Sequence, residues 1–421
     1  MDKFIITGGR QLSGSVQASG AKNASLALMP ASILASGKSI LNNTPVLNDV
    51  YTMIKLLKHL GAEINFENER LEIDTKNVNN FTAPYEHVKK MRASVYVLGP
   101  LLARFGKAEV SLPGGCAWGP RPINLHLEAM KKLGAEIDLK DGYVIAKAKN
   151  LKGTKINFDV SSVGATGNAM MAAVLAKGTS FINNAAIEPE ITQLAEFLIQ
   201  MGARINGVGT NKIEIEGVNE LHPVEIVTIP DRIESGTLLV AAAITRGKIN
   251  LINTSSENLE AVLLKLEDYG CKILRKPNEV TLDAKEIDSM PVSVTTSIYP
   301  GFPTDMQAQW TALMSVTKGV STVTDTIYSD RFKHVPELNR LGAKIELDKN
   351  TAVITGVKQL KGAKVMSTDL RASASLVLAG LAAEGTTEVL RVYHLDRGYQ
   401  RIEEKLKSLG ANVERIESKE Y

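Results

Sequence analysis

The chain has 421 residues, of which 44% are apolar, 23% charged and only 5% aromatic, and this length suffices for two or three domains that each bury a core. The 49 Lys and Arg against 46 Asp and Glu leave a formal net charge of +3, so composition gives no reason to expect nucleic acid or an anionic membrane as a partner. No stretch approaches the roughly 18 consecutive apolar residues that span a bilayer, and we expect no membrane insertion.

The first residues and the cysteines bear on location and on metals. Residues 1–9 contain too short an apolar stretch for a secretory signal peptide. Two cysteines, Cys116 and Cys271, in so long a chain argue against a disulfide framework, and the sequence has no zinc-type cluster or paired-histidine motif. We therefore expect a cytoplasmic protein without a metal ion and without a cofactor.

One phrase recurs six times along the chain. In each copy an amphipathic helix ends, a glycine follows, and alternating residues enter a strand. The six copies are Leu60-Gly-Ala-Glu-Ile64, Leu133-Gly-Ala-Glu-Ile137, Met201-Gly-Ala-Arg-Ile205, Tyr269-Gly-Cys-Lys-Ile273, Leu341-Gly-Ala-Lys-Ile345 and Leu409-Gly-Ala-Asn-Val413. Their glycines are spaced by 68 to 73 residues, so the sequence predicts six copies of one repeat of about seventy residues.

A polar segment opens a second, strongly apolar helix in every repeat. The six openings are Gly20-Ala-Lys-Asn-Ala-Ser25, Lys90-Met-Arg-Ala-Ser94, Val163-Gly-Ala-Thr-Gly167, Pro230-Asp-Arg-Ile-Glu-Ser235, Pro303-Thr-Asp-Met-Gln307 and Thr368-Asp-Leu-Arg-Ala-Ser373. The helices behind them, such as residues 169–176 and 373–380, are apolar nearly all round, which is typical of buried helices.

The two ends of the chain complete one another. The last repeat stops near Ile416 without its second strand, whereas residues 4–14 resemble that missing piece as it occurs at residues 353–362. We therefore expect the N-terminus to complete the C-terminal domain. Two sets of three repeats then give one domain at 22–229 and a second at 1–21 plus 230–421, with two linkers between them.

Cationic residues recur at the helix openings, where unpaired N–H groups and the helix dipole favour anions. Equivalent positions in four repeats hold Lys22, Arg92, Arg232 and Arg371, and loops add Arg121, Arg331 and Arg397. Their joint recurrence favours an anion-binding cleft. The alternative is that each arginine pairs with a nearby carboxylate, namely Asp231, Glu234, Asp369 or Asp396.

Two loops punctuated by Gly and Pro carry candidate chemical groups. The segment from Leu112 to His126 contains three Gly and three Pro, so we expect an exposed, shaped loop. Its Cys116 is either a structural thiol or a nucleophile or acid activated by neighbouring cations. Asp305, in the second loop, is either a helix cap or a general base. Cys271 replaces the Ala of the recurring phrase and is interpreted as a packing residue.

With these segments assembled, the chain resembles the enolpyruvyl transferases of bacterial cell-wall synthesis over essentially its whole length. Besides the openings at Gly20 and Lys90, the resemblance is carried by the Leu-Pro-Gly-Gly-Cys116 loop with Gly119-Pro-Arg-Pro122, Pro303-Thr-Asp-Met-Gln-Ala-Gln309, Arg331-Phe-Lys-His-Val-Pro-Glu-Leu338, Asp369-Leu-Arg-Ala-Ser373 and Tyr393-His-Leu-Asp-Arg-Gly-Tyr399. It implies an inside-out α/β barrel: two domains, each of three repeats with buried helices, and an active site in the cleft between them.

The resemblance also implies a reaction and roles for particular residues. Enolpyruvyl passes from phosphoenolpyruvate to the 3′-hydroxyl of UDP-N-acetylglucosamine, with release of phosphate, at the first committed step of peptidoglycan synthesis. Cys116, on a loop that closes as a lid, is the expected acid and Asp305 the expected base. Lys22, Asn23, Arg121 and Arg397 are expected to contact phosphoenolpyruvate. The UDP-sugar is expected on Arg92, Arg121, Pro122, Ile123, Asn124, Leu125, Ser162, Val163, Gly164, Asp305 and Ile327, and Arg331, Asp369 and Arg371 complete the expected binding site.

Departures and alternatives are few. Trp118, Asn124, Gly167 and Asn168 differ from the family pattern, which bears on affinity for the sugar more than on reaction type. One alternative is the related shikimate-pathway enolpyruvyl transferase, against which the Pro-Gly-Gly-Cys116 loop argues. The other is a regulatory paralogue that binds UDP-sugar with little turnover. Small-molecule substrates are the expected partners, and regulatory protein partners are not readable from the sequence.

Overall fold

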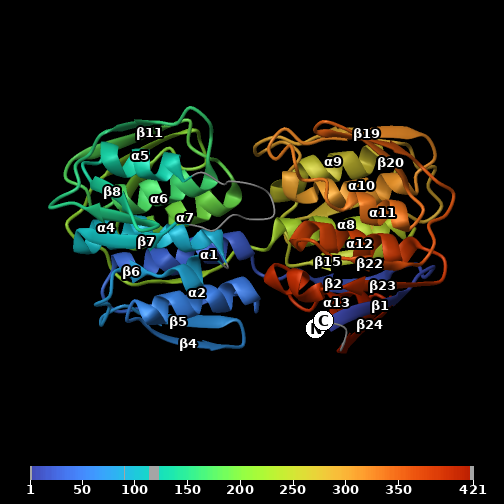
Figure 1. Cartoon of the computed structure of the whole chain (residues 1–421), viewed down its shortest axis with the longest axis horizontal. Helices are drawn as coiled ribbons and strands as arrows, with labels where there is room; N and C mark the ends of the chain where they lie inside the picture. Colours follow the sequence, from blue (N-terminus) through green and yellow to red (C-terminus); the bar gives the residue numbers. More distant parts are fainter. Residues whose placement is uncertain (1, 90, 113–122, 418–421) are drawn as a thin grey trace. The chain divides into compact units, whose positions relative to one another are not determined.

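The computed structural model describes residues 2–89, 91–112 and 123–417, and the chain forms two compact units (Figure 1). Unit 1 comprises Met1–Ser19 and Pro230–Tyr421, and unit 2 comprises Gly20–Ile229. Unit 2 therefore starts two residues before the expected boundary. The reason is local: the Ala21 N–H donates to the Ile229 carbonyl at 2.7 Å, and Gly20 packs so tightly on the Asn43 carbonyl that no Cβ would fit.

The described strands form six four-stranded sheets, and all six have one topology. Across each sheet, starting from the strand named first below, the first and second strands pair parallel. The two further pairings in the sheet are antiparallel. In unit 2 the sheets are β14 (Glu225–Val227), β3 (Lys38–Asn42), β5 (Arg70–Asp74), β4 (Glu63–Glu67); β6 (Thr82–Ala83), β7 (Lys107–Ser111), β9 (Tyr143–Lys147), β8 (Glu136–Lys140); and β10 (Lys155–Asn157), β11 (Thr179–Asn183), β13 (Lys212–Glu216), β12 (Arg204–Asn206).

Unit 1 repeats this arrangement. Its sheets are β2 (Ser13–Gln17), β15 (Lys248–Ile252), β17 (Glu279–Asp283), β16 (Lys272–Lys276); β18 (Val294–Thr295), β19 (Val320–Thr324), β21 (Thr351–Thr355), β20 (Lys344–Asp348); and β22 (Lys364–Met366), β23 (Thr386–Leu390), β1 (Asp2–Thr7), β24 (Asn412–Glu417). The sixfold repetition is the structural counterpart of the recurring phrase. Each sheet is open, so the described strands form no closed barrel.

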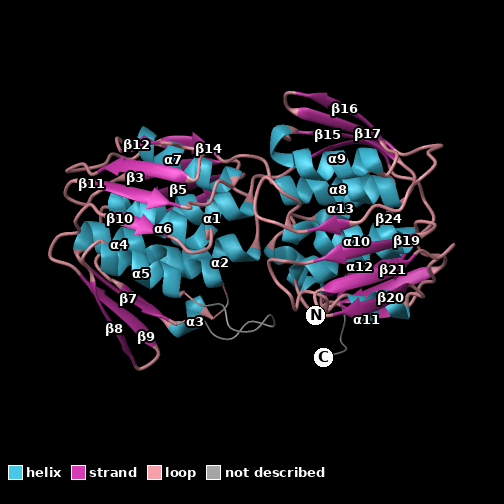
Figure 2. Cartoon of the chain, turned by 90° about the horizontal axis from the view of Figure 1, so that it is seen from above, coloured by secondary structure: helices cyan, strands magenta, loops and turns pink. Residues whose placement is uncertain are grey.

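Each unit has apolar helices inside and strands outside, as Figure 1 and Figure 2 show. The inner helices are α1 (Lys22–Ala31), α4 (Leu98–Phe105) preceded by the 3₁₀ turn η2 (Arg92–Val97), and α6 (Val163–Ala173) in unit 2, and α8 (Arg232–Ile244), α10 (Gln307–Ser315) preceded by η4 (Thr304–Met306), and α12 (Leu370–Ala382) in unit 1. Every residue of α10 is buried. The predicted α/β class with buried helices is confirmed.

Amphipathic helices flank these. They are α2 (Asn48–His59), α3 (Tyr85–Val88), α5 (Asn124–Lys132), α7 (Pro189–Gln200), α9 (Glu260–Asp268), α11 (Val335–Arg340) and α13 (Ile402–Ser408), with 3₁₀ turns η1 (Ser32–Leu34), η3 (Glu257–Leu259) and η5 (Val392–Arg397). Six of them end in the recurring phrase, whose glycines have φ between 90° and 112°. This is the left-handed region that glycine adopts at little cost, so the predicted helix-to-strand transition is confirmed.

The N-terminal strands belong to unit 1. β1 pairs antiparallel with both β23 and β24, with Phe4 opposite Val389 and Arg415, so β1 lies in the sheet of the last repeat. β2 pairs parallel with β15, although the chain continues from β2 into α1 of unit 2. Conversely, β14 pairs with β3, although the chain continues from β14 into α8 of unit 1. Each unit thus keeps a strand that the sequence places before a helix of the other unit.

A repeated asparagine fastens the parallel strand pairs. Asn43, Asn184 and Asn253 follow β3, β11 and β15, and each has a φ of 53° to 55°. Their side-chain amides donate to the carbonyls that follow the parallel neighbours, at Thr228, Phe158 and Ala18 respectively, over 2.8 to 3.0 Å. The same kind of asparagine contact therefore holds β14 and β2, which are distant in sequence from their parallel partners, and β10, which is close in sequence to its partner.

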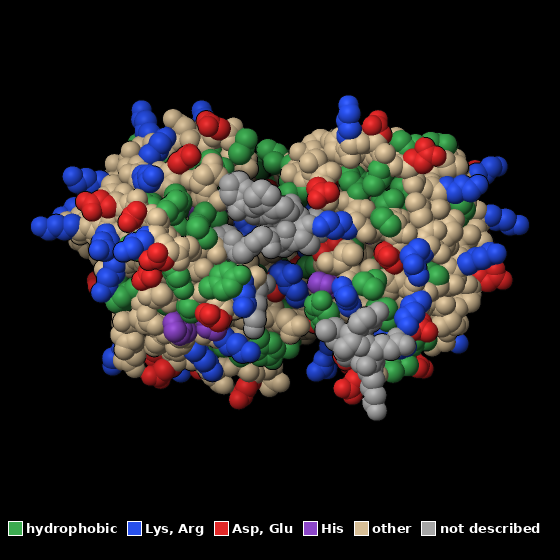
Figure 3. All heavy atoms as spheres, in the orientation of Figure 1, with side chains coloured by type: hydrophobic (Ala, Val, Ile, Leu, Met, Phe, Trp, Pro, Cys, Tyr) green, Lys and Arg blue, Asp and Glu red, His purple; other side chains and the backbone are tan. Residues whose placement is uncertain are grey.

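The surface is mixed in charge. Figure 3 shows Lys and Arg side chains interspersed with Asp and Glu over the visible face of each unit, in keeping with the near-neutral total. Within the described ranges the helices are all too short or too polar to cross a membrane.

We predict that Phe4→Ala destabilises unit 1. Phe4 is fully buried in the unit 1 core, so removing its ring should lower the free energy of unfolding by about 3–5 kcal/mol. Urea denaturation followed by circular dichroism measures this. Thr7→Ala, at an exposed position of the same strand, is the control. Equal stability of Phe4→Ala and the parent chain would contradict the placement of β1 in this core.

Candidate functional site

Asp305 lies between two arginines at the opening of an inner helix of unit 1. It is the middle residue of η4, and its two carboxylate oxygens accept hydrogen bonds from Arg331 Nη2 at 2.6 Å and Arg371 Nη2 at 2.8 Å. Arg371 is the second residue of α12, so the contact joins two repeats. η4 has no side-chain cap among the described contacts, and the carboxylate of Asp305 therefore serves the arginines rather than the helix.

The charge state of Asp305 follows from these contacts. Burial raises its pKa, but the guanidinium groups of Arg371 and Arg331 lower it more, and the result lies well below the usual value of 3.8. The pKa of Arg371 is raised: burial lowers it, but Asp305, together with Tyr399 and Asp231, raises it more. The cluster is ionised at neutral pH, with two cations to one anion.

A buried polar network holds Arg371 in place. Its Nη1 donates to the Tyr399 hydroxyl at 3.0 Å, which also receives a hydrogen bond from Gln309 Nε2 at 3.1 Å and lies 3.0 Å from Thr237 Oγ1. Burial raises the pKa of Tyr399, so the hydroxyl stays neutral. These side chains come from α8, α10 and the loop after η5, so all three repeats of unit 1 contribute to the position of Arg371. Tyr399, Gln309 and Thr237 were not among the residues predicted for the site.

Asp369 and Arg397 both lie near the start of α12. The Asp369 carboxylate caps the helix by accepting from the N–H groups of Arg371 and Ala372 at 3.0 and 3.1 Å. Arg397 ends η5, and the next residue, Gly398, packs so closely on the Leu370 side chain that a Cβ would lie 2.6 Å from it. Burial lowers the pKa of His394, which also senses both Asp369 and Arg397. Two predicted residues of the site are therefore close to the helix opening that carries Arg371.

Arg415 is a further residue that sequence reasoning missed. It donates to both oxygens of Asp396 at 2.5 to 3.1 Å and to Glu403 at 2.7 Å. Two carboxylates that were expected to pair with the site arginines therefore pair with other residues. Asp396 binds Arg415, and Glu234 binds Lys405 at 2.8 Å. By fixing Asp396, Arg415 also fixes the backbone that carries Arg397.

Asp325 organises the loop that carries Ile327 and Arg331. Its fully buried carboxylate accepts from Thr296 Oγ1 at 2.9 Å and Thr304 Oγ1 at 2.7 Å, and from the backbone N–H groups of Ile327 and Tyr328. Asp325 comes directly after β19, just as Asn43, Asn184 and Asn253 come directly after their strands. This equivalent position in the repeat is the signal that could have identified Asp325.

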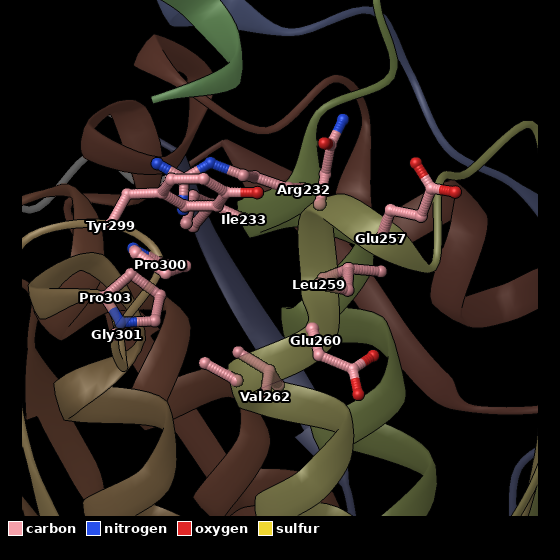
Figure 4. Close-up of a pocket in the computed structure, with 12 residues that line it drawn as sticks. Arg232, Ile233, Glu257, Leu259, Glu260, Val262, Tyr299, Pro300, Gly301 and Pro303 are labelled. Atoms are coloured by element: carbon pink, nitrogen blue, oxygen red, sulfur yellow. The ribbon is translucent and has the colours of Figure 1, made fainter. Parts of the chain in front are cut away.

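Arg232, the third recurring cation, lies beside the loop that leads to Asp305. Its guanidinium is 5.5 Å from the centre of the Tyr299 ring. Figure 4 shows both at a cavity of about 20 Å³ that Pro300, Gly301 and Pro303 also line. The volume holds about one water molecule, so this cavity by itself is no substrate site.

In unit 2, Lys22 begins α1 and forms an ion pair with Asp49 of α2. The distance from Lys22 Nζ to Asp49 Oδ2 is 2.7 Å, and both side chains are largely buried. The adjacent Asn23 is the second residue of the helix. Asp49 was missed by sequence reasoning, because it lies 27 residues from Lys22 in an ordinary helix opening.

The predicted sugar-binding residues of unit 2 gather around His126 and Tyr96. Ser162 caps α6 by accepting from the Ala165 N–H at 3.3 Å, and the Tyr96 hydroxyl donates to the Val163 carbonyl at 3.4 Å. Gly164 lies so close to the His126 ring that a Cβ there would be 3.0 Å away. His126 in turn follows Asn124 and Leu125 in α5, behind Ile123.

Arg92 belongs to the same group. Burial raises the pKa of Tyr96, an effect that Arg92 opposes. Burial and Arg92 together lower the pKa of His126 to about 3, so this imidazole is neutral. The unusual Asn168 explains the arrangement: its amide bonds His126 Nδ1 at 2.9 Å, the Val95 carbonyl at 2.9 Å and the Gly99 N–H at 2.8 Å. The adjacent Gly167 leaves room for the Tyr96 ring.

Several predicted residues lie outside the described part of the chain. They are Cys116, Trp118, Arg121 and Pro122. The other cysteine, Cys271, is 6% exposed in the unit 1 core, as a packing residue should be, and burial raises the pKa of its thiol to about 12. Among the described residues no three His, Cys, Asp or Glu side chains lie together as metal ligands.

Known proteins resemble the chain along its whole length. Residues 6–406 match the family described as EPSP synthase (3-phosphoshikimate 1-carboxyvinyltransferase). A protein of Chloroherpeton thalassium named UDP-N-acetylglucosamine 1-carboxyvinyltransferase is 58% identical over 99% of this chain and 97% of its own. The enolpyruvyl transferase NikO from Streptomyces tendae has a TM-score of 0.89 at 26% identity, with 99% of both chains covered. EPSP synthase from Acinetobacter baumannii, at 17% identity and a TM-score of 0.78 over 99% of this chain and 100% of its own, shares the fold.

We predict that Asp305→Asn lowers stability with a specific pH dependence. The change leaves two guanidinium groups, 10% and 6% exposed, without their shared carboxylate. Because Asp305 itself is 26% exposed, we expect a loss of about 1–3 kcal/mol at neutral pH. The pKa of Asp305 is lower in the folded chain than in the unfolded chain, where it is about 3.9. The ionised carboxylate therefore stabilises the fold above about pH 4, and this stabilisation is lost as the pH falls through the pKa of the folded state.

Urea denaturation of both chains from pH 7 down to pH 3 measures this difference. It should stay constant to about pH 4 and shrink only below that value. Asp268→Asn, which removes the exposed ion pair with Lys265, is the control and should have a much smaller effect. A difference that persists undiminished at the lowest pH would show that the carboxylate charge is not its cause.

Proposed function

Because the chain belongs to the EPSP synthase (3-phosphoshikimate 1-carboxyvinyltransferase) family, we propose that it transfers enolpyruvyl from phosphoenolpyruvate to the 3′-hydroxyl of UDP-N-acetylglucosamine and releases phosphate. The resemblance found in the sequence is confirmed at the level of the family, and the chain is a transferase. The observation that carries the choice of acceptor is the near-full-length identity with relatives named for UDP-N-acetylglucosamine.

The proposed substrates are anions, and cations at the openings of buried helices are suited to them. Phosphoenolpyruvate carries a carboxylate and a phosphate, for which we propose Lys22, Asn23, Arg121 and Arg397. Helix N-termini and fixed guanidinium groups stabilise charge that develops on a leaving phosphate. The group around Arg92, His126 and Ser162–Gly164 is proposed to hold the UDP-sugar. The proposal requires residues of both units to act on the same pair of substrates.

The reaction is an addition followed by an elimination. The sugar hydroxyl oxygen forms a bond to C2 of phosphoenolpyruvate and loses its proton to a base, while C3 gains a proton from an acid. C3 then gives up a proton, and the bond from C2 to the phosphate oxygen breaks, which restores the double bond. Cys116 is the proposed acid, and it could also add at C2; Asp305 is the proposed base.

The low pKa of Asp305 refines its proposed role. A carboxylate between two arginines is ionised at neutral pH but is a weak base, and a free alcohol would not transfer its proton to it. Once the oxygen begins to bond to C2, the hydroxyl becomes strongly acidic, and a weak base suffices. Asp305 therefore orients the hydroxyl first and accepts its proton late. Arg331 and Arg371 set this order.

Further parts of the proposal concern the setting. We propose that the product enters peptidoglycan synthesis at its first committed step, in the cytoplasm, and that the loop with Cys116 closes over the substrates. The shikimate-pathway reaction is the second candidate within the family. A UDP-sugar-binding paralogue with little turnover is the third.

We predict phosphate release from phosphoenolpyruvate and UDP-N-acetylglucosamine, and none with shikimate 3-phosphate as the acceptor. Cys116→Ser and Asp305→Ala should each lower the rate by about 10²–10⁴-fold, as expected for loss of an acid or a base. Cys271→Ser is the matched control, because that thiol is buried in the core, and should keep the rate. A colorimetric phosphate assay makes these measurements. Absence of turnover with the UDP-sugar would refute the proposed function, and binding without turnover would favour the paralogue.

We also predict selective alkylation by an epoxide phosphonate of the fosfomycin type. The reagent should modify Cys116 and leave Cys271 unmodified, because the raised pKa of Cys271 keeps it a thiol. Mass spectrometry of the digested protein distinguishes the two sites. The Cys116→Ser variant should show no adduct; an adduct on Cys271 in the parent chain would reverse the assignment of the two thiols.

A further inference from the structure

A basic groove in unit 2 lies apart from every residue assigned to the reaction. It passes the C-terminal ends of α4 and α6 and crosses one end of the sheet that contains β7, β8 and β9, which Figure 2 shows together. Three adjoining pockets share lining residues there, and the two larger have volumes of about 840 and 700 Å³, within the range of ligand clefts. Five exposed lysines line the groove: Lys107, Lys147, Lys149, Lys152 and Lys177.

The charge of the groove is unbalanced. Its acidic lining residues are Glu109 and Glu136. No ion pair within the described ranges involves any of the five lysines. The remaining cation, Arg104, faces inward and donates to the carbonyls of Ile33 and Ala35 at 2.8 and 2.9 Å. The lysines are therefore available to an external anion.

Strand pairing sets two of these lysines against each other. Lys107, at the start of β7, lies directly opposite Lys147, at the end of β9. At the same position in two sister sheets Lys38 lies opposite Asp74, and Lys248 lies opposite Asp283, with an ion pair of 3.0 Å in the latter. Like charges directly opposite one another destabilise a sheet. At the groove this cost is partly offset, because Lys147 also lies opposite Glu136 on its other side. The sister sheet with Lys38 has a like-charge pair of the other sign, Glu63 opposite Asp74.

A second pairing at the groove repeats the pattern. The backbone bridge after α6 sets Lys152 opposite Lys177. The equivalent bridge in unit 1 sets Lys361 opposite Glu384. Twice, therefore, the groove has a lysine where a sister repeat has an acid. Lysines at these two pairings concentrate positive charge at the groove, as a surface that binds an anion requires.

We propose that this groove is a docking site for an extended, acidic polypeptide segment of a partner protein. Its course along three pockets suits a chain rather than a compact ion, and its concave shape does not suit the flat surface of a membrane. Bases of single-stranded nucleic acid need exposed aromatic faces. The rings along the groove, Phe105 and Phe81, are covered by Arg104 and Lys107 at 4.8 and 4.4 Å.

The test introduces at the groove the acidic residues that occupy the equivalent positions in other repeats. Lys147→Asp with Lys177→Glu should lower the affinity for fluorescein-labelled deca-glutamate by about tenfold or more at low ionic strength, measured by fluorescence anisotropy. The matched control is Lys344→Asp with Lys358→Glu, which changes the net charge equally at exposed positions of unit 1 and should retain binding. Both double variants should keep the phosphate-release rate of the parent chain, because none of these lysines belongs to the proposed site.

Other outcomes would overturn the proposal. Equal loss of binding in both double variants would indicate attraction to net charge alone. Binding of vesicles of phosphatidylserine, without binding of the peptide, would make the groove a membrane contact.

Thermal unfolding of the groove variant tests the strand argument independently. Its midpoint should stay close to that of the parent chain, because the acid at position 147 gains attraction to Lys107 but loses the favourable pairing with Glu136, and the acid at position 177 gains attraction to Lys152. A much lower midpoint would refute the claim that these lysines serve binding rather than the fold.

Discussion

The constraint on which both units depend is the removal of six inner helices from water on every side. A helix with one apolar stripe packs on one sheet, but helices such as α6, α8 and α10 are buried along nearly their whole length and must be enclosed. Three helices enclosed by three sheets satisfy this, because each sheet needs only one apolar face. The sixfold topology follows from this need for enclosure.

Enclosure leaves the helix ends as the places where polar groups are tolerated. The first N–H groups of a helix have no partner within it, and Asp231, Ser162 and Asp369 supply side-chain caps. Cations at the same ends, Lys22, Arg92 and Arg371, add charge to an already positive helix terminus. The proposed binding groups are therefore concentrated where the fold would otherwise be weakest.

Much of this architecture is readable in the sequence because it is periodic. The helix, glycine and strand of each repeat are local features, and the missing strand of the last repeat is visible by comparison with its sisters. The partners of the ionised groups are not readable in this way. Asp305 meets Arg371 across 66 residues, and Lys22 meets Asp49 through the packing of α1 on α2. Composition shows that these charges exist, but tertiary packing decides which of them touch.

The exchanged strands have a consequence for how the chain is made. β1 and β2 leave the ribosome before the other described elements, yet their partners β15, β23 and β24 begin at residues 248, 386 and 412. Unit 2 is one continuous segment of the sequence, and it can close as soon as β14 emerges. Residues 1–19 must wait until more than half of the chain has been synthesised. At 5–20 residues per second this delay is on the order of ten seconds or more. During that time β1 and β2 have no native partner, so unit 2 must fold while two strand-forming segments of the same chain remain unpaired.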